Sequence, residues 1–278
     1  MWKKIKSFIR LIYRNNEVLG NNVLKKRRIN LEWWNVRPNV GDCLAPVIYD
    51  YIIKYYNLDE NTHKKRTIHL MTVGSIIGIK SYDAVIWGAG IHLQENIYNM
   101  MRKRKIVEYD IRAVRGPLTR QILMGSGYEC PQVYGDPAIL MPQIYCKQEI
   151  SEKKYPISVV IHLNQKYQKR KELHYIEIKT DDYKGFIDEI CNSSLVIASS
   201  LHAIILAESY GVPAIFLLEG VEKEIIKYYD WYYSTGRYSV SVARSLDEAL
   251  KMEPMPLPDL EKMRTELISS FPIDLWKE

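Results

Sequence analysis

The chain alternates short apolar runs, which predict buried strands, with longer segments of three-to-four-residue apolar spacing, which predict helices. Its first half gives expected strands at 29–35, 67–73, 83–87 and 105–114. The second half restarts the alternation, with strands at 157–163, 175–178, 195–199 and 212–218 and helices at 183–191 and 201–210. Strands that are apolar throughout are typical of parallel sheets covered on both faces. The pattern therefore predicts an α/β fold with two Rossmann-like domains facing a cleft.

A domain boundary is expected between the two series of strands. Residues 142–156 hold two prolines and a run of charges, which is typical of a linker. We therefore expect a basic amphipathic segment at 1–30, a Rossmann-like domain at 31–148, and a second such domain with C-terminal helices at 149–278. The length agrees, because 278 residues correspond to about two domains of ordinary size.

Composition narrows the class of protein. Hydrophobic residues make up 47% of the chain and charged residues 26%, as in soluble globular proteins. No apolar stretch is long enough to span a membrane. The four cysteines form no Cys-x-x-Cys pair, so reduced cytoplasmic thiols are expected rather than a disulfide scaffold or a zinc site.

The net charge of +6 is distributed unevenly. Residues 1–30 hold nine Lys and Arg and one Glu, whereas the rest of the chain is slightly acidic. A nucleic-acid enzyme would carry its basic stripe across the folded body, so no nucleic-acid partner is expected. Apolar residues recur at helical spacing over 2–14. Two interpretations stay open: a helix packed on the body, or an interfacial helix through which residues 1–28 bring a cytoplasmic protein to anionic lipid at the inner face of the membrane.

Candidate chemistry lies where strands end, because ligands of open parallel sheets bind beyond the carboxyl ends of the strands. Glycines there let a backbone approach a ligand closely, and hydroxyls, arginine and helix N-termini favour an anion. Five exits carry such residues: 39–42 with Gly41 and Asp42, 87–92 with Gly88, Gly90 and His92, 112–119 with Arg115, 135–138 with Asp136, and 199–203 with Ser199, Ser200 and His202.

Each of these candidates also has a structural alternative. Asp42 either caps the following helix or acts as a general acid or base. His202 either stabilises a helix start or moves a proton. Arg115 either holds a phosphate or carboxylate or forms a surface salt bridge. Asp136 precedes a proline and favours a turn, and for His92 a structural and a functional role are equally expected.

Other chemistries fit the sequence poorly. It contains no P-loop, no His-Glu-x-x-His and no Gly-x-Ser-x-Gly. An Asp-x-Asp motif, which would suggest a metal-dependent glycosyltransferase, is also missing. The histidines show no metal-ligand spacing, so no metal site is expected.

Taken together, the strand-exit segments resemble the polysaccharide pyruvyl transferase family. The matching pieces are Asn-Val-Gly-Asp at 39–42, Trp-Gly-Ala-Gly at 87–90, Val-Arg-Gly-Pro-Leu-Thr at 114–119, Gly-Asp-Pro-Ala at 135–138 and Ser-Leu-His-Ala at 200–203. The stretch at 207–214 continues the resemblance, and residues 227–234 are similar to a segment of the exopolysaccharide-modifying branch. The order and spacing of the pieces over about residues 33–240 make the combination specific.

The resemblance implies a two-domain fold like that of GT-B glycosyltransferases. It also implies transfer of pyruvate from phosphoenolpyruvate onto two hydroxyls of one hexose, which forms a cyclic ketal. The implied acceptor is a bacterial surface polysaccharide or its lipid-linked precursor. The scheme requires neither a cofactor nor a metal, because phosphoenolpyruvate is itself the donor substrate. Some relatives place an arginine where this chain has Ser200, and Lys223, Lys227 and Arg237 are candidates to replace it.

Within this scheme Asp42 and His202 are expected to act as acid and base, in either order. Arg115 is expected to hold the donor as a third catalytic residue, and further donor contacts are expected from Gly41, Gly88, Gly90, Ser199, Ser200 and His202. The chain has 21 tyrosines, whose polar tips suit sugar binding, although a helix packing face explains the densest cluster equally well. Acceptor contacts are expected from His92, Asp136, Tyr229 and Tyr232.

Two functions of other kinds stay open. One is a GT-B glycosyltransferase that uses a nucleotide sugar, because its fold and cleft would be similar. The other is a non-catalytic scaffold of a polysaccharide assembly complex. Release of phosphate from phosphoenolpyruvate, against release of a nucleoside diphosphate from a sugar nucleotide, would distinguish the two enzymes.

Overall fold

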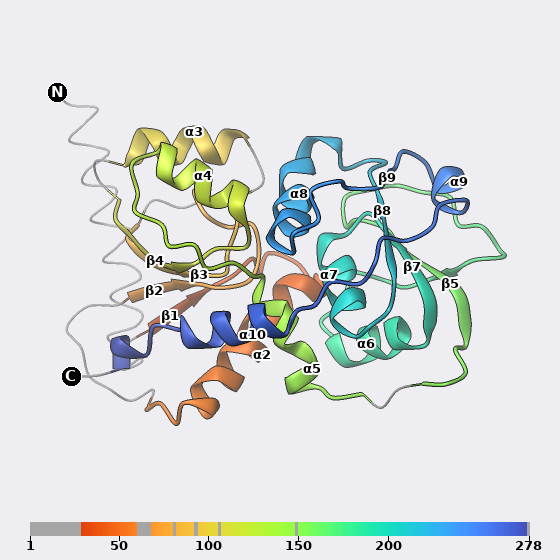
Figure 1. Cartoon of the computed structure of the whole chain (residues 1–278), viewed down its shortest axis with the longest axis horizontal. Coiled ribbons are helices and arrows are strands. Elements are labelled where there is room, and N and C mark those ends of the chain that lie inside the picture. Colours follow the sequence, from red (N-terminus) through yellow and green to blue (C-terminus); the bar gives the residue numbers. More distant parts are fainter. Residues whose placement is uncertain are drawn as a thin grey trace.

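The computed structural model describes residues 29–59, 68–79, 82–91, 94–104, 107–147 and 150–276. The amphipathic helix expected within the first 28 residues therefore lies outside the described residues, as does His92. Figure 1 shows the two halves of the chain side by side, the first at the left and the second at the right.

The first half forms a four-stranded parallel sheet in the order β1-β2-β3-β4. Its strands are β1 (Ile29–Glu32), β2 (Ile68–Met71), β3 (Ala84–Trp87) and β4 (Tyr109–Ala113). The helices are α2 (Val40–Tyr55), α3 (Gln94–Lys103) and α4 (Pro117–Gly125). All four residues of β3 are buried, as expected for a central strand covered on both faces.

The second half forms a five-stranded parallel sheet in the order β6-β5-β7-β8-β9. The strands are β5 (Tyr155–Val160), β6 (His174–Tyr175), β7 (Ser193–Ala198), β8 (Ala214–Leu217) and β9 (Val242–Ala243). The helices are α6 (Tyr183–Cys191), α7 (Leu201–Ser209), α8 (Ile225–Ser234) and the short α9 (Leu246–Ala249). The two parallel sheets confirm the predicted α/β fold and are consistent with two Rossmann-like domains.

Short elements join the halves. The 3₁₀ turn η1 (Pro137–Leu140) leads into α5 (Met141–Ile144), and both pack on α7 and α2. A further 3₁₀ turn, η2 (Glu222–Glu224), precedes α8. One large apolar cluster runs through both halves and includes Leu44 of α2, Ile204 of α7 and Trp231 of α8. The halves therefore share a core.

The end of the described chain returns to the first half (Figure 1). Helix α10 (Glu261–Ser269) and the 3₁₀ turn η3 (Ile273–Trp276) lie beside β3 and β4. The indole of Trp87 donates to the carbonyl of Leu267 at 2.8 Å. Arg112 of β4 donates to both carboxylate oxygens of Asp274 at 2.8 Å each. The C-terminal elements thus cover the sheet of the opposite half.

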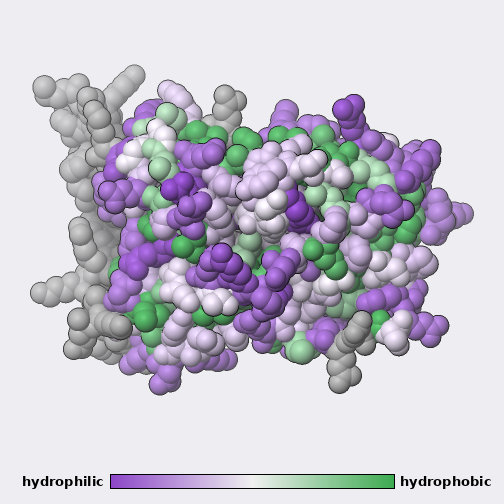
Figure 2. All heavy atoms as spheres, in the orientation of Figure 1, coloured by the Kyte–Doolittle hydropathy of each residue, from purple (hydrophilic) through white to green (hydrophobic). Residues whose placement is uncertain are grey.

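Details of several elements differ from the sequence prediction. Helix α3 and strand β9 are not among the elements predicted from the sequence, because α3 is polar overall and β9 has only two residues. Residues 133–139, for which the sequence allows a short strand or a loop, form a single bridge between Val114 and Tyr134 followed by η1, whose start Asp136 caps. Among the residues that the structure describes, no helix combines the length and apolarity needed to cross a membrane. Hydrophilic residues cover much of the face in Figure 2.

Candidate active site

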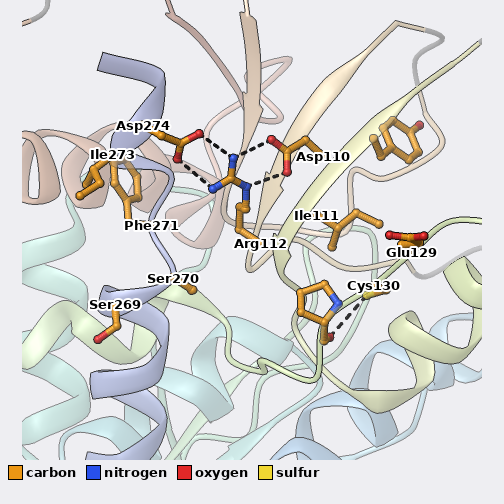
Figure 3. Close-up of a pocket in the computed structure, with 12 residues that line it drawn as sticks. Asp110, Ile111, Arg112, Glu129, Cys130, Ser269, Ser270, Phe271, Ile273 and Asp274 are labelled. Atoms are coloured by element: carbon orange, nitrogen blue, oxygen red, sulfur yellow. Dashed lines mark hydrogen bonds and ion pairs between the residues drawn. The ribbon is translucent and has the colours of Figure 1, made fainter. Parts of the chain in front are cut away.

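A cleft of about 430 Å³ opens where the carboxyl ends of the two sheets face each other. Both halves line it, the first with Arg37, Asp42, Ser75 and Asn96 and the second with His162, Ser200, His202, Glu224 and Lys227. A larger, more open hollow of about 830 Å³ runs along β4 and η3. Figure 3 shows that its centre is the Arg112 clamp between Asp110 and Asp274. No predicted site residue lines that hollow, so the cleft is the candidate site.

Asp42 and His202 stand at two helix starts in this cleft. Asp42 lies in the first turn of α2, and His202 is the second residue of α7. A Cβ on Gly41 would lie 2.0 Å from Nδ1 of His202, so only glycine lets the imidazole lie against α2. Burial raises the pKa of Asp42, and the nearby charge of His202 and a hydrogen bond from Asn39 oppose that rise. The raised pKa makes the Asp42 carboxylate a stronger base.

Asp136 lies behind the imidazole of His202. Its Oδ1 accepts a hydrogen bond from the backbone of Ala138 at 3.1 Å, and its Oδ2 lies 3.6 Å from Nε2 of His202. Both of these facing atoms are buried and lack a hydrogen-bond partner within the described part of the chain. Catalytic hydrogen bonds are often long in a ligand-free site and tighten when substrate binds. Asp136 is therefore placed to orient the imidazole of His202.

Lys227 supplies a cation from the opposite wall. It lies on α8, is only 8% exposed, and bonds the carboxylate of Glu224. Burial lowers the pKa of Lys227, while the charges of Glu224 and Asp42 favour its protonated form. The second imidazole of the cleft, that of His162, lies 3.6 Å from Glu224. The ammonium of Lys227 has three N–H donors, so it can bind an anion in the cleft while it also bonds Glu224.

Arg37 adds a second cation at the mouth of the cleft. Its guanidinium donates to the side chain of Asn164, which belongs to the second half. The contact spans the opening between the halves, and both residues line the cleft. Within the described residues, no group of three or more His, Cys, Asp and Glu is arranged to hold a metal ion.

Arg115 lies behind the cleft wall rather than in it. Its guanidinium is 0% exposed and donates to Asp230 at 3.2 Å, to the hydroxyl of Ser75 at 2.6 Å and to the carbonyl of Ile91 at 2.8 Å. A Cβ on Gly90 would lie 2.3 Å from the guanidinium carbon. The geometry therefore gives Arg115 a positioning role through Ser75, and it gives Gly90 the role of making room for Arg115. Both differ from the donor contacts expected from the sequence.

Asp230 is the buried partner of Arg115 and comes from α8 of the second half. It accepts hydrogen bonds from the backbone and hydroxyl of Thr119 at 3.0 and 2.7 Å. Burial raises the pKa of Asp230, and the charge of Arg115 opposes the rise. The network fixes α8, which carries Lys227, against α4 of the first half.

The remaining predicted residues divide between the cleft and the core. Ser200 lines the cleft immediately before α7. Ser199 is buried, donates to Gln165 at 2.9 Å and accepts from the backbone of His162 at 2.8 Å. A Cβ on Gly88 would lie 2.4 Å from the ring of Pro137. Ser199 and Gly88 therefore shape the walls of the cleft.

The tyrosines expected to bind the acceptor lie elsewhere. Tyr232 is 1% exposed in the core. Tyr229 is half-buried with its ring edge-on to Tyr233, and neither it nor Tyr232 lines the cleft. The helix packing face, the alternative left open by the sequence, describes this cluster better. Neither Tyr229 nor Tyr232 is therefore placed to contact a ligand in the cleft.

Of the three residues considered as replacements for the missing arginine, the structure places one in the cleft. Arg237 donates to both carboxylate oxygens of Glu208 at 2.6 and 2.8 Å and is thereby occupied. Lys223 is exposed and does not line the cleft, whereas Lys227 does. Ser75 was missed, although it follows Gly74 at a strand exit, the signal that identified the other candidates.

The fold and site define a two-lobed α/β protein with a polar cleft at the carboxyl ends of two parallel sheets, an arrangement that suits an anionic ligand. Residues 47–219, more than half of the chain, match the family described as polysaccharide pyruvyl transferase. The chain therefore belongs to the polysaccharide pyruvyl transferase family, a family of enzymes.

The proteins that are similar to this chain include one from a virus and one from a bacterium. Uncharacterized protein L143 of Acanthamoeba polyphaga mimivirus is 28% identical over 175 residues, which cover 59% of this chain and 58% of that protein. The chain thus matches little more than half the length of that relative. The crystal structure of functional uncharacterized protein KP1_0663 from Klebsiella pneumoniae subsp. pneumoniae NTUH-K2044 covers 84% of this chain and 99% of its own, with a TM-score of 0.51 and 14% identity. That likeness shows the fold alone.

Proposed function

We propose that this protein transfers pyruvate from phosphoenolpyruvate onto two hydroxyls of a hexose in a glycan, forming a cyclic ketal and releasing phosphate. The observation that carries the proposal is that Asp42 and His202 both line the cleft and interact electrostatically, with Asp136 behind the imidazole. A paired acid and base is what this addition and elimination need. Family membership supplies the class of reaction.

The chemistry can be written with the groups present. A proton is added to the vinyl carbon of the donor, and the first sugar hydroxyl attacks the neighbouring carbon. Phosphate then leaves, and the second hydroxyl attacks the same carbon to close the ketal. Of the two protons that the hydroxyls lose, one balances the proton added to the vinyl carbon and the other leaves with phosphate.

The environments of the two groups suggest how the roles divide. His202 acts as the acid in this proposal, because its imidazole lines the cleft and Asp136, 3.6 Å from its Nε2, holds the ring from behind. Asp42 acts as the base, because burial has raised the pKa of its carboxyl group and a stronger base removes a hydroxyl proton more readily. Both are placed by the first turns of helices whose N-termini also favour a bound anion.

Lys227 and Arg37 are proposed to hold the phosphate and carboxylate of the donor. Lys227 lines the cleft, as does Ser200 at the position where some relatives have arginine. An anion next to Lys227 would offset the cost of keeping its ammonium buried. In this proposal Arg115 contributes indirectly, by holding Ser75 at the cleft wall.

The test is to incubate the full chain with phosphoenolpyruvate and methyl hexosides, and to measure free phosphate together with the mass of the sugar. We expect acceptor-dependent phosphate release and a sugar heavier by one pyruvate less one water. Asp42→Asn and His202→Ala should each lower the rate by about 10²–10⁴-fold. The matched controls are Asp247→Asn and His174→Gln, whose side chains form ion pairs outside the cleft. Release of a nucleoside diphosphate from sugar nucleotides, without any pyruvylated sugar, would instead identify a glycosyltransferase.

The cellular setting is part of the proposal. A lipid-linked precursor of a bacterial surface polysaccharide is the proposed acceptor, in line with the exopolysaccharide-modifying branch that the sequence resembles. The basic residues between 1 and 28 would draw the enzyme toward anionic lipid at the inner face of the membrane, where such a precursor is found.

A further inference from the structure

A second, smaller hollow of about 140 Å³ lies beside the cleft, where β1 ends. It shares Trp34, Ile76 and Ile79 with the cleft. A ligand seated in the hollow would therefore lie directly next to a ligand in the cleft. An apolar cavity of about 150 Å³ holds a benzene molecule, so this hollow has the size for one six-membered ring.

The walls of the hollow are aromatic with one carboxylate. Trp33, Trp34 and Tyr82 provide rings, and among the described residues of the lining Glu32 alone carries a formal charge. Binding sites for small molecules typically combine apolar and aromatic walls with a few fixed polar groups. The flat C–H face of a sugar ring packs on an indole, and a carboxylate accepts hydrogen bonds from sugar hydroxyls.

Glu32 is held in place by a buried network. Its Oε1 accepts from the side-chain amide of Asn30 at 2.5 Å and lies 2.7 Å from Nδ1 of His69. Tyr82 also hydrogen-bonds Glu32, and its ring stacks on His69 with centroids 3.9 Å apart. Glu32 is only 7% exposed. Replacing such buried polar groups with apolar ones is often neutral or stabilising, so stability alone does not account for a fixed carboxylate at a cavity wall.

Charge separates the hollow from the cleft. The cleft carries Lys227 and Arg37, which suit the anionic donor. The hollow has no cation among the lining residues that the structure describes, and its carboxylate would repel phosphoenolpyruvate. A neutral polyhydroxylated ring fits the hollow, because it can pack on the aromatic walls and is not repelled by the carboxylate of Glu32.

We infer that this hollow is the acceptor subsite and that it holds one hexose ring, with an indole against the ring and Glu32 bonded to ring hydroxyls. The inference rests on the proposed function, because that function supplies the reason for a sugar next to the cleft. A hexose held here presents its remaining hydroxyls across the shared wall to the donor.

The experiment measures two kinds of binding separately on the full chain. Saturation-transfer NMR with the methyl glycosides of glucose, galactose and mannose reports the hollow, and calorimetry with phosphoenolpyruvate reports the cleft. We expect at least one hexoside to bind, and Trp34→Ala and Glu32→Gln each to weaken it by roughly tenfold or more. The affinity of Glu32→Gln for phosphoenolpyruvate should stay within about twofold of the wild type, because Glu32 lines the hollow and not the cleft.

Controls keep the inference open to refutation. Trp34 is 38% exposed, so its replacement tests the hollow even where Glu32→Gln unfolds the chain. Tyr238→Ala removes an aromatic ring that is 70% exposed and lines neither the cleft nor the hollow beside it. This variant should bind hexosides as the wild type does. Wild-type chain that binds none of the hexosides, or Trp34→Ala that binds them unchanged, overturns the inference. Trp34-dependent hexoside binding without phosphoenolpyruvate binding would support the subsite while contradicting the proposed reaction.

Discussion

The buried pair of Arg115 and Asp230 offers the clearest stability test, because it connects the two halves behind the cleft. In Asp230→Ala the guanidinium of Arg115 remains 0% exposed but loses its carboxylate partner. Thr119 loses the acceptor of both its backbone N–H and its hydroxyl. The variant thus leaves one buried charge and two buried donors without the partner that they have in the wild type.

The size of the effect follows from that burial. Removing one partner of a buried ion pair costs about 3–5 kcal/mol of the free energy of unfolding. For a chain of this size each kcal/mol lowers the melting temperature by about 2–4 °C. We therefore expect Asp230→Ala to melt about 6–20 °C below the wild type.

Differential scanning calorimetry, supported by urea titration, measures this change. The matched control is Asp247→Ala, which also removes an aspartate 2.8 Å from an arginine, Arg170, but whose side chain is 69% exposed. The control should melt close to the wild type, because water screens exposed ion pairs. The double variant Arg115→Met, Asp230→Leu should recover much of the lost stability, since it leaves no charge unpaired.

Either of two calorimetric results would contradict the expected role of the buried pair. If Asp230→Ala and Asp247→Ala lowered the melting temperature equally, burial of the Arg115 pair would not set its contribution. A double variant less stable than Asp230→Ala would contradict the claim that the unpaired guanidinium causes the loss.

Three further predictions concern the cleft and the N-terminal segment. Gly41→Ala should lower the turnover rate by about 10²-fold with the fold intact, because its Cβ would displace His202. The control Gly125→Ala, whose Cβ would meet nothing within 4 Å, should have the wild-type turnover rate. Lys227→Met should weaken phosphoenolpyruvate binding in calorimetry by about tenfold or more, whereas the exposed control Lys223→Met should not, and equal affinities would contradict the donor assignment. Deletion of residues 1–28 should abolish sedimentation of the protein with anionic vesicles, whereas its weak sedimentation with neutral vesicles should stay the same. Unchanged sedimentation with anionic vesicles would exclude the membrane role of this segment.

The sequence predicted the central strands well because strands such as β3 and β8 are short and apolar throughout. It also selected Asp42, His202 and Asp136, since each follows a strand and the carboxyl ends of parallel strands meet at one edge. The structure places all three together. Their chemical roles stay predictions until the variants are assayed.

The sequence did not reveal which way a side chain turns. Arg115 occupies a strand exit as expected, but it faces inward because Asp230 lies 115 positions later in the chain and reaches it from α8. Lys227 enters the cleft from the same distant helix. Tyr232 looked suited to sugar binding by residue type, yet it packs in the core. These outcomes depend on contacts between distant segments, which local spacing does not encode.

Catalysis of pyruvate transfer onto a sugar by Asp42 and His202 is the proposal on which the other functional predictions depend. The most direct measurement is mass spectrometry of methyl hexosides incubated with phosphoenolpyruvate and the full chain, with free phosphate measured in the same samples. The account predicts one pyruvylated sugar per phosphate released by the wild type, and loss of both products in His202→Ala. Phosphate release without a pyruvylated sugar, or near-normal turnover in His202→Ala, would contradict it.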